Sequence, residues 1–360
     1  MGTEHNRFAA AAIERFLATA FVALGVPDED AKTVAGLMVE ADLTGYDTHG
    51  TFRLRQYMNR LRDGGTNARA DVTIAQDSGA TALVDGDNGL GHLAMRFAAD
   101  LAIKKAEQYG IGWVGVRNGN HAGPASLYVR MPAAHDMIGL YAAVGSANHV
   151  PPFGGTELLL GTNPIAIAVP AGASPPFVLD MATTIAAAGK IKTLAQRGEP
   201  MPEGWMVGPD GKPLTDPARH KEGFLLPIGG PKGYGLATAI GLLAGTLNGA
   251  AFGRDVVDFT NDTTSPTNTG QFIAAVSVAA FGDIAAFKAN IEAVFQSMRE
   301  SETLPGHDAV RIPGDRHEAI FKDRQANGIP LHPNLQKALS EIAAELGIDD
   351  LARPEAEPGA

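Results

Sequence analysis

The sequence predicts a mixed α/β protein in which helices flank a sheet. Short apolar runs of strand length recur between residues 81 and 281, and amphipathic stretches of helical period lie between and beyond them. A strand, a helix and a second strand follow one another over residues 81–116, as in a βαβ unit. With 360 residues, 45% hydrophobic and 19% charged, the chain can form two or three domains with a substantial core.

Helical segments are expected near both ends of the chain. Residues 7–25 and 29–43 have the apolar spacing of helices, and Gly45 ends the second one. Near the other end, residues 331–347 have apolar side chains on one side of a predicted helix. Further helices are expected over residues 92–109 and 284–300.

The predicted strands are short and apolar. They cover residues 81–84, 111–116, 138–144, 165–169, 177–180 and 272–281. Two other segments lack clear periodicity. Residues 196–232 are rich in glycine and proline, which is typical of a long ordered loop over a site, and the polar residues 260–270 are expected to be mobile.

The uncharged segment from Gly233 to Gly253 is long enough to span a bilayer. It is only mildly apolar, however, and no second span exists to pair with it. Its glycines recur every four residues from Gly241 to Gly253, so on a helix they would form one smooth stripe. We therefore expect a buried helix at a domain or subunit contact and no membrane span.

Charge and composition exclude several classes of protein. The formal net charge of −11, without any basic run, makes a general grip on nucleic-acid phosphates unlikely. The absence of cysteine excludes disulfides, thiolate metal ligands and cysteine nucleophiles, and it suits a cytoplasmic enzyme. Residues 1–7 show no signal-peptide pattern. The histidines do not have metal-ligand spacing on one element, so we expect no metal.

Two histidines lie in glycine-framed loops. His121 follows the predicted strand at 111–116 within Asn118–Gly123, and His49 lies within Asp47–Gly50. Loop histidines at strand ends are suited to acid/base chemistry near neutral pH. The alternative for each is a structural, hydrogen-bonded loop histidine.

A possible carboxylate site follows His49. If Thr48 is the N-cap of the next helix, then His49, Arg53 and Tyr57 are spaced four apart along one helical face. A proton donor, a guanidinium and a phenol in one row can bind a small carboxylate. The alternative is an ordinary solvated helix face.

Residues Gly89–Ala94 fit the dinucleotide-binding glycine pattern between a strand and a helix. A Rossmann site also needs an acidic residue at the end of the second strand, but that strand ends in Val116-Arg117-Asn118. Arg117 could instead serve a 2′-phosphate. A glycine turn that packs the helix onto the sheet is the better interpretation.

Two more positions could contact a cofactor. Asp180 ends a predicted strand, where an acid can orient a histidine or bind a ribose hydroxyl. Its alternative is the cap of a helix that starts at Met181. Pro231-Lys232-Gly233 precedes the glycine-striped segment, and a helix N-terminus beside a lysine suits a phosphate.

Together these motifs resemble the malate/L-lactate dehydrogenase family of NAD(P)-dependent oxidoreductases. In chain order they are Ala41–Gly50, Arg53, Tyr57, Asn118–Gly123, Pro152–Gly155, Gly161–Pro164, Leu179–Thr183, Gly189–Ile191 and Pro231–Gly233. The resemblance runs from about residue 8 to residue 350. Its motifs are dispersed and keep the family order, which makes the set more specific than any one of them.

The resemblance implies a non-Rossmann α/β (α+β) fold, with a largely antiparallel sheet flanked by helices and a helical terminal domain. It also implies a homodimer with sites near the subunit contact. Three units are expected: residues 1–75 with 325–352 as the helical unit, 76–123 with 255–324 as the nucleotide-binding sheet unit, and 124–254 as the catalytic and cofactor unit.

The resemblance also assigns roles to residues. His121, His49 and Asp180 are the implied catalytic residues, and Thr48, Arg53 and Tyr57 the implied substrate contacts. Position 48 is usually serine in the family; threonine keeps the hydroxyl, but its methyl group could narrow the pocket. The implied cofactor contacts are Ser146, Gly154, Gly155, Asn163, Asp180, Met181, Ala182, Lys190, Lys232, Gly233, Pro313 and Gly314.

The predicted reaction is hydride transfer between NAD or NADP and C2 of a small 2-hydroxy or 2-oxo acid. The expected partner is a small carboxylate, with no nucleic acid and no membrane. An NAD(P)H-dependent reductase of piperideine- or pyrroline-2-carboxylate is the alternative, since it needs the same hydride and the same arginine. A non-enzymatic binding protein on the same fold is the alternative from another class.

Overall fold

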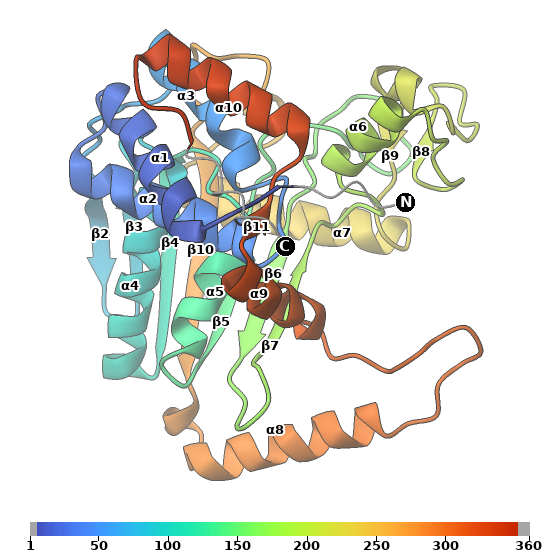
Figure 1. Ribbon diagram of the computed structural model, residues 1–360. Coiled ribbons are helices and arrows are strands. Elements are labelled where there is room, and N and C mark those ends of the chain that lie inside the picture. The colour runs from blue at the N-terminus through green and yellow to red at the C-terminus, as the bar shows by residue number, and fades with distance from the viewer. Residues whose placement is uncertain (1–5, 352–360) are drawn as a thin grey trace, which may run out of the picture.

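The computed structural model describes residues 6–351, and one seven-stranded sheet forms its centre (Figure 1). In spatial order the strands are β2 (Thr73–Ser78), β3 (Thr81–Asp85), β4 (Ile111–Gly119), β10 (Thr269–Ser277), β5 (Met137–Ala143), β6 (Ile165–Val169) and β7 (Phe177–Met181). Only β3 and β4 pair in parallel, while the other neighbours are antiparallel. This confirms the predicted α/β class and the largely antiparallel sheet.

Helices α4 (Gly91–Tyr109) and α5 (Ser126–Ala133) cover one face of the sheet. Alternate side chains of the strands point toward them, among them Val114, Val116 and Ile273, all fully buried. The unit β3–α4–β4 is the predicted βαβ crossover. Sequence analysis missed α5, which is short and contains Pro132.

The opposite face is covered by α7 (Pro231–Ile240) and the turns that follow it. The helix continues as a π-helical turn over Gly241–Gly245 and a 3-10 turn over Thr246–Asn248. The prediction of one helix to Gly253 is therefore wrong. A Cβ on Gly241 would lie 2.1 Å from the Phe252 ring, so this glycine packs against its own chain and not against a partner.

A helical layer joins the two ends of the described chain. Helices α1 (Ala10–Ala23), α2 (Asp28–Leu43), α3 (Leu54–Asp63) and α10 (Pro333–Leu346) share one apolar core. Strand β1 (Arg7–Phe8) pairs with β11 (Ile329–Pro330) beside it. The outermost residues of the predicted helical unit, 1–5 and 352, lie outside the described residues.

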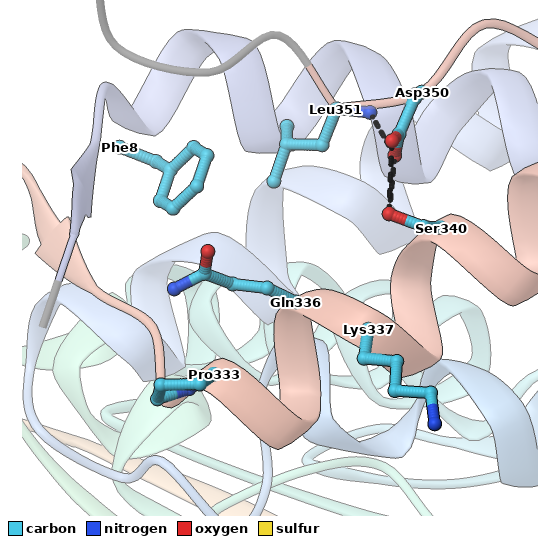
Figure 2. A pocket seen from close by; sticks show the side chains of 7 residues that line it. All are labelled: Phe8, Pro333, Gln336, Lys337, Ser340, Asp350 and Leu351. Carbon is cyan, nitrogen blue, oxygen red and sulfur yellow. Dashed lines mark hydrogen bonds between the residues drawn. The ribbon is translucent and has the colours of Figure 1, made fainter. Parts of the chain in front are cut away.

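A surface cavity of about 320 Å³ lies between β1 and α10 (Figure 2). Phe8, Gln336 and Leu351 line it, and Asp350 beside them accepts a hydrogen bond from Ser340. None of the predicted site residues is among its lining residues.

The remaining elements lie outside these layers. They are α6 (Ala188–Arg197), β8 (Met206–Val207), β9 (Phe224–Leu225), α8 (Ile284–Arg299) and α9 (Asp315–Asn327). Figure 1 shows α8 projecting away from the sheet, followed by a long excursion of the chain that returns to α9. Helices α6 and α9 were not predicted, because neither has a clear apolar stripe next to an N-cap signal.

Two further expectations need correction. The segment 260–270 is anchored rather than loose, because the buried Arg60 guanidinium donates to the carbonyls of Asp262 and Ser265. The expected boundary at residue 124 also separates strands of one sheet, since β5 to β7 continue the sheet that holds β3, β4 and β10. Among the described residues no helix is long and apolar enough to cross a membrane.

The contact of Gly241 yields a stability prediction. Gly241→Ala should lower the free energy of unfolding by roughly 1–3 kcal/mol, because the new methyl group overlaps the Phe252 ring. Gly36→Ala in α2 is the matched control, since its Cβ would meet only Glu14 at 3.8 Å. The control should gain about 0.5–1 kcal/mol. Urea unfolding measures both, and equal effects of the two variants would contradict the packing role.

Candidate functional site

His49 lies in a turn between α2 and α3. A 3-10 turn over Thr51–Arg53 precedes α3, so Thr48 is not the predicted N-cap. Its hydroxyl instead lies 2.8 Å from His49 Nδ1. The turn therefore brings His49 toward Tyr57 without the regular helical spacing that the sequence suggested.

His121 lies just after β4, on backbone that is fixed from several sides. The buried Asn120 amide donates to the Asn88 and Gly89 carbonyls at 3.1 and 2.9 Å. A Cβ on Gly91 would lie 2.1 Å from the Asn120 carbonyl oxygen. Gly91 therefore lets α4 approach the His121 segment closely, which explains the glycine pattern that resembled a Rossmann site.

The structure brings the two predicted histidines together. The His49 and His121 rings stack with centroids 5.5 Å apart and planes 22° apart. Tyr57, only 1% exposed, places its hydroxyl 2.6 Å from His121 Nδ1. The Phe259 ring packs against both Tyr57 and His121. Residues from three distant parts of the chain thus form one cluster.

Arg53 provides the positive charge beside the histidines. Its Nε donates to the Thr48 carbonyl at 2.7 Å, and its Nη1 donates to Gln56 Oε1 at 2.6 Å. No residue of the described chain accepts a hydrogen bond from Nη2. The half-buried guanidinium is therefore held in place while one of its edges stays available to a ligand.

Burial and charge together keep both histidines neutral. Burial, assisted by Arg53 and His92, lowers the pKa of His49 to about 3. Burial and the same positive neighbours hold the pKa of His121 well below its usual value. Since each shift disfavours the imidazolium form, both rings are unprotonated at neutral pH, and a bound anion that offsets the charge of Arg53 would raise their pKa values.

Asp180, at the end of β7, supports this cluster from a distance. Its carboxylate accepts the Ser126 N–H at 2.8 Å, at the start of the helix that follows the His121 loop. Burial raises the pKa of Asp180, although that bond lowers it in part. Asp180 thus caps α5 and not the helix that the sequence suggested at Met181, which continues β7 instead.

The predicted cofactor segments converge beside the end of β7. Thr183, next to Met181 and Ala182, donates its N–H to the Thr162 carbonyl and accepts from the Ile228 N–H, both at 2.9 Å. Ile228 leads directly into the Lys232 segment. The exposed Phe153, next to Gly154 and Gly155, has its ring 3.9 Å from where a Cβ of Gly230 would lie.

Four further cofactor candidates are Lys190, Lys232, Pro313 and Gly314. Lys190 stacks over the Trp205 ring at 4.9 Å, and neighbouring Gly189 would place a Cβ 3.6 Å from the Thr48 methyl group. The Pro313 carbonyl, followed by Gly314, accepts the Val178 N–H at 2.9 Å on β7. Lys232 lies exposed in the first turn of α7.

Three other candidates have evident structural tasks. The fully buried Asn163 amide accepts the Gly145 N–H and donates to the Ala237 carbonyl. A Cβ on Gly233 would lie 2.1 Å from the Ile228 carbonyl oxygen. The Ser146 carbonyl accepts the Phe259 N–H at 2.9 Å and so fixes the ring that packs on His121.

Sequence analysis missed two buried ionisable residues at the site. His92 is fully buried, packs edge-on against Tyr57 with centroids 5.5 Å apart, and has no hydrogen-bond partner for either ring nitrogen. Asp42 is 3% exposed and binds the turn that follows His49. An ionisable residue within an apolar helix stretch was the available signal for both. Among the described residues no three potential metal ligands cluster.

Comparison with known proteins identifies the family. The model of the malate/L-lactate dehydrogenase family matches residues 8–340. The chain therefore belongs to the malate/L-lactate dehydrogenase family, as the motifs predicted.

Similar proteins agree over nearly the whole length. L-sulfolactate dehydrogenase of Methanocaldococcus jannaschii is 42% identical over 325 residues, covering 90% of this chain and 93% of the relative. The solved structure of the sulfolactate dehydrogenase from this organism superposes with a TM-score of 0.89 at 39% identity, covering 95% and 98% of the two chains.

Malate dehydrogenase of Pyrococcus horikoshii superposes with a TM-score of 0.88 at 32% identity, covering 97% of this chain and 98% of the other. The (2R)-3-sulfolactate dehydrogenase (NADP(+)) of Chromohalobacter salexigens is 32% identical, covering 86% of this chain and 90% of the relative. Family membership confirms the predicted class, an oxidoreductase that uses NAD or NADP and acts on 2-hydroxy acids.

Buried His92 yields a pH-dependent prediction. Burial lowers its pKa to about 3, so between pH 6.5 and 3 the unfolded chain binds more protons and stability falls as the pH falls. The substitution His92→Gln removes this loss of stability at low pH. The unfolding free energy of the variant relative to the wild type should therefore rise by about 2 kcal/mol from pH 7 to pH 5. Urea unfolding at both pH values measures it.

His135→Gln is the control, because His135 is exposed. Its unfolding free energy should keep a constant offset from the wild type over the same range. A constant offset for His92→Gln as well would show that folding does not lower the pKa of His92.

Proposed function

We propose that the His49–His121 cluster is the catalytic centre at which a small 2-hydroxy acid is oxidised, or the matching 2-oxo acid reduced. The observation that carries this proposal is the pairing of two neutral histidines, one bonded to buried Tyr57, beside a fixed guanidinium. The substrate carboxylate binds the free edge of Arg53, which sets the face that C2 presents.

The bound carboxylate also prepares the proton transfer. It offsets the positive charge of Arg53, which is one cause of the low pKa of His121. His121 then takes a proton more readily. When C2 is reduced, the oxygen on C2 gains charge and His121 donates a proton to it; in the oxidation His121 accepts the hydroxyl proton.

The contacts of His121 suggest which nitrogen does this. Nδ1 lies 2.6 Å from the Tyr57 hydroxyl and, at the longer distance of 3.4 Å, from the Gly123 nitrogen. We therefore assign the neutral tautomer in which Nδ1–H donates to the Tyr57 oxygen, so that Nε2 faces the substrate with a free lone pair. Nε2 can then accept the hydroxyl proton in the oxidation, and protonated Nε2 donates it in the reduction. His49, stacked beside His121, then contacts the same substrate, with Thr48 orienting its ring.

The residues at the end of β7 fit a dinucleotide. Bound there, nicotinamide supplies the hydride acceptor or donor. Lys190 and Lys232 provide positive charge for phosphates, and the turn of Gly154 and Gly155 lies beside the N-terminus of α7. Met181 and Ala182 provide backbone at the end of β7, Pro313 and Gly314 lie against Val178 of the same strand, and Asp180 supports the site through Ser126.

The names of the relatives suggest the substrate. Sulfolactate and malate, for which similar proteins are named, are both small 2-hydroxy acids with a second acidic group. No carboxylate of this chain contacts His49, His121 or Arg53 in the described structure, so a second acidic group would meet no repulsion there. We propose a substrate of this kind.

The test follows nicotinamide absorbance with NADH or NADPH and a panel of acceptors: pyruvate, oxaloacetate, sulfopyruvate, a diketo sugar acid and a cyclic imine acid. We expect turnover of a dicarboxylate-like oxo acid. His121→Ala should lower it on the order of a hundredfold or more, because the proton donor is lost.

His135→Ala is the matched control, since it removes an exposed histidine outside the cluster. It should keep wild-type turnover. Near-normal turnover of a folded His121→Ala enzyme would refute the assignment of His121. Turnover of the imine alone would favour the reductase alternative, and no binding of either cofactor would favour a binding protein.

We also propose that the chain acts as a cytoplasmic homodimer. Four leucines on and after α7 are exposed, with Leu242 at 50% and Leu247 at 64% exposed; the others are Leu236 and Leu243. They lie opposite the face that packs on the sheet. An exposed apolar patch of this kind is typical of a protein–protein contact.

Light scattering coupled to size-exclusion chromatography tests the dimer. The wild type should have twice the mass of the chain, and Leu247→Asp should shift the population toward monomer. Val22→Asp, at an exposed position on α1, should leave the mass unchanged. A monomeric wild type would rule out the dimer, and an unaffected Leu247→Asp dimer would place the contact elsewhere.

A further inference from the structure

We propose that Asp42 is a positioning residue that holds the His49 turn in the geometry needed for catalysis. Asp42 lies in the last turn of α2, beneath the loop that carries Thr48 and His49. The inference rests on the proposed function, because it assigns a task to a residue that touches neither substrate nor cofactor.

The contacts of the carboxylate are directed at the turn. Oδ2 accepts the Thr51 N–H at 2.9 Å and the Thr51 hydroxyl at 2.5 Å. Thr51 is fully buried and begins the 3-10 turn that leads to Arg53. One carboxylate oxygen therefore fixes the chain between the histidine and the guanidinium.

Gly50, between His49 and Thr51, shows how closely the turn packs against Asp42. A Cβ on Gly50 would lie 2.0 Å from Asp42 Oδ1. The backbone after His49 thus lies directly on the carboxylate. Any movement of Asp42 would be passed to the His49 backbone across one residue.

A second anchor holds the earlier part of the same loop. The Arg324 guanidinium of α9 donates to the Asp42 carbonyl and to the Asp47 carboxylate. His317 Nδ1 lies 2.7 Å from the Thr44 carbonyl, and its ring stacks on Tyr46 at 4.4 Å. These contacts fix residues 44–47, and Asp42 provides the anchor at Gly50 and Thr51, after His49.

The electrostatic surroundings indicate which substitution preserves the contact. Burial, with a smaller contribution from Asp47, raises the pKa of Asp42 to about 7, although the Thr51 hydrogen bonds and Arg324 oppose the rise. An amide at this position keeps an accepting oxygen and avoids a buried charge. Asp42→Asn should therefore preserve the turn, whereas Asp42→Ala leaves the Thr51 N–H without a partner.

The experiment measures single-turnover hydride transfer and cofactor affinity separately. In Asp42→Ala the transfer rate should fall tenfold or more, with the dissociation constant of NAD(P)H changed less than about twofold. Asp42→Asn should stay within about threefold of the wild-type rate. An unchanged rate in folded Asp42→Ala would overturn the proposal, as would equal losses in both variants. If Asp42→Ala does not fold, Thr51→Val should lower the rate in its place.

Glu292→Ala is the matched control. Glu292 also accepts backbone N–H groups, from Gly172 and Ser174 at 2.9 and 2.8 Å, and the Ser174 hydroxyl at 2.7 Å. It fixes a loop that contributes nothing to the His49 cluster. This variant should lose thermal stability without losing turnover per folded molecule.

A readout without turnover separates this proposal from the proposed function. With histidine ring carbons labelled, the His49 NMR resonance, assigned through His49→Gln, reports the turn directly. In Asp42→Ala its pKa should rise toward that of a solvated histidine, and in Asp42→Asn it should not. An unmoved resonance would refute positioning by Asp42 even if the enzyme is active, and a moved one would support it even if no substrate turns over.

Discussion

The contact between Tyr57 and His121 is the one on which the rest of the site depends. It joins the helical layer, which holds His49 and Arg53, to the end of a central strand of the sheet. Neither layer alone contains a complete set of acid/base and anion-binding groups. The close approach that makes the contact possible needs a glycine at position 91, where any side chain would overlap the Asn120 carbonyl. The dimensions of the site are thus set where two layers meet.

The packing of the helical layer on the sheet also determines the electrostatics of the site. Three histidines, a tyrosine and an arginine are enclosed together. The pKa of each of the three histidines is lowered, which disfavours their charged form. Without a ligand, the histidine rings of this centre are therefore neutral, and the Arg53 guanidinium carries its positive charge. In the proposed mechanism an entering carboxylate offsets the charge of Arg53, so substrate binding raises the pKa of the proposed proton donor, His121.

The sequence was sufficient to predict the class of fold and to select His49, Arg53, Tyr57 and His121, which lie together, but it was insufficient for their geometry. His121 could be found because a histidine between glycines after an apolar strand has few structural uses. The N-cap role of Thr48 was wrong, because the 3-10 turn at Thr51 is imposed by the tertiary contact with Asp42 and not by local preference. The prediction of an uninterrupted helix to Gly253 was wrong for a similar reason, because the chain folds back and places Phe252 against Gly241. No role was predicted for His92 and Asp42, because their importance comes from burial in the folded protein, which the spacing of residues in the sequence does not reveal.

The pairing of β1 with β11 has a consequence for the order in which the protein assembles. Helices α1 and α2 are made first, yet they share their core with α10 near the other end of the described chain. During synthesis the part of this core that α10 covers stays exposed until almost the whole polypeptide has left the ribosome, although α1 can already pack on α2. The sheet, whose strands end at Ser277, can form well before that. The His49 turn would therefore take its final position late, on a sheet that already presents His121.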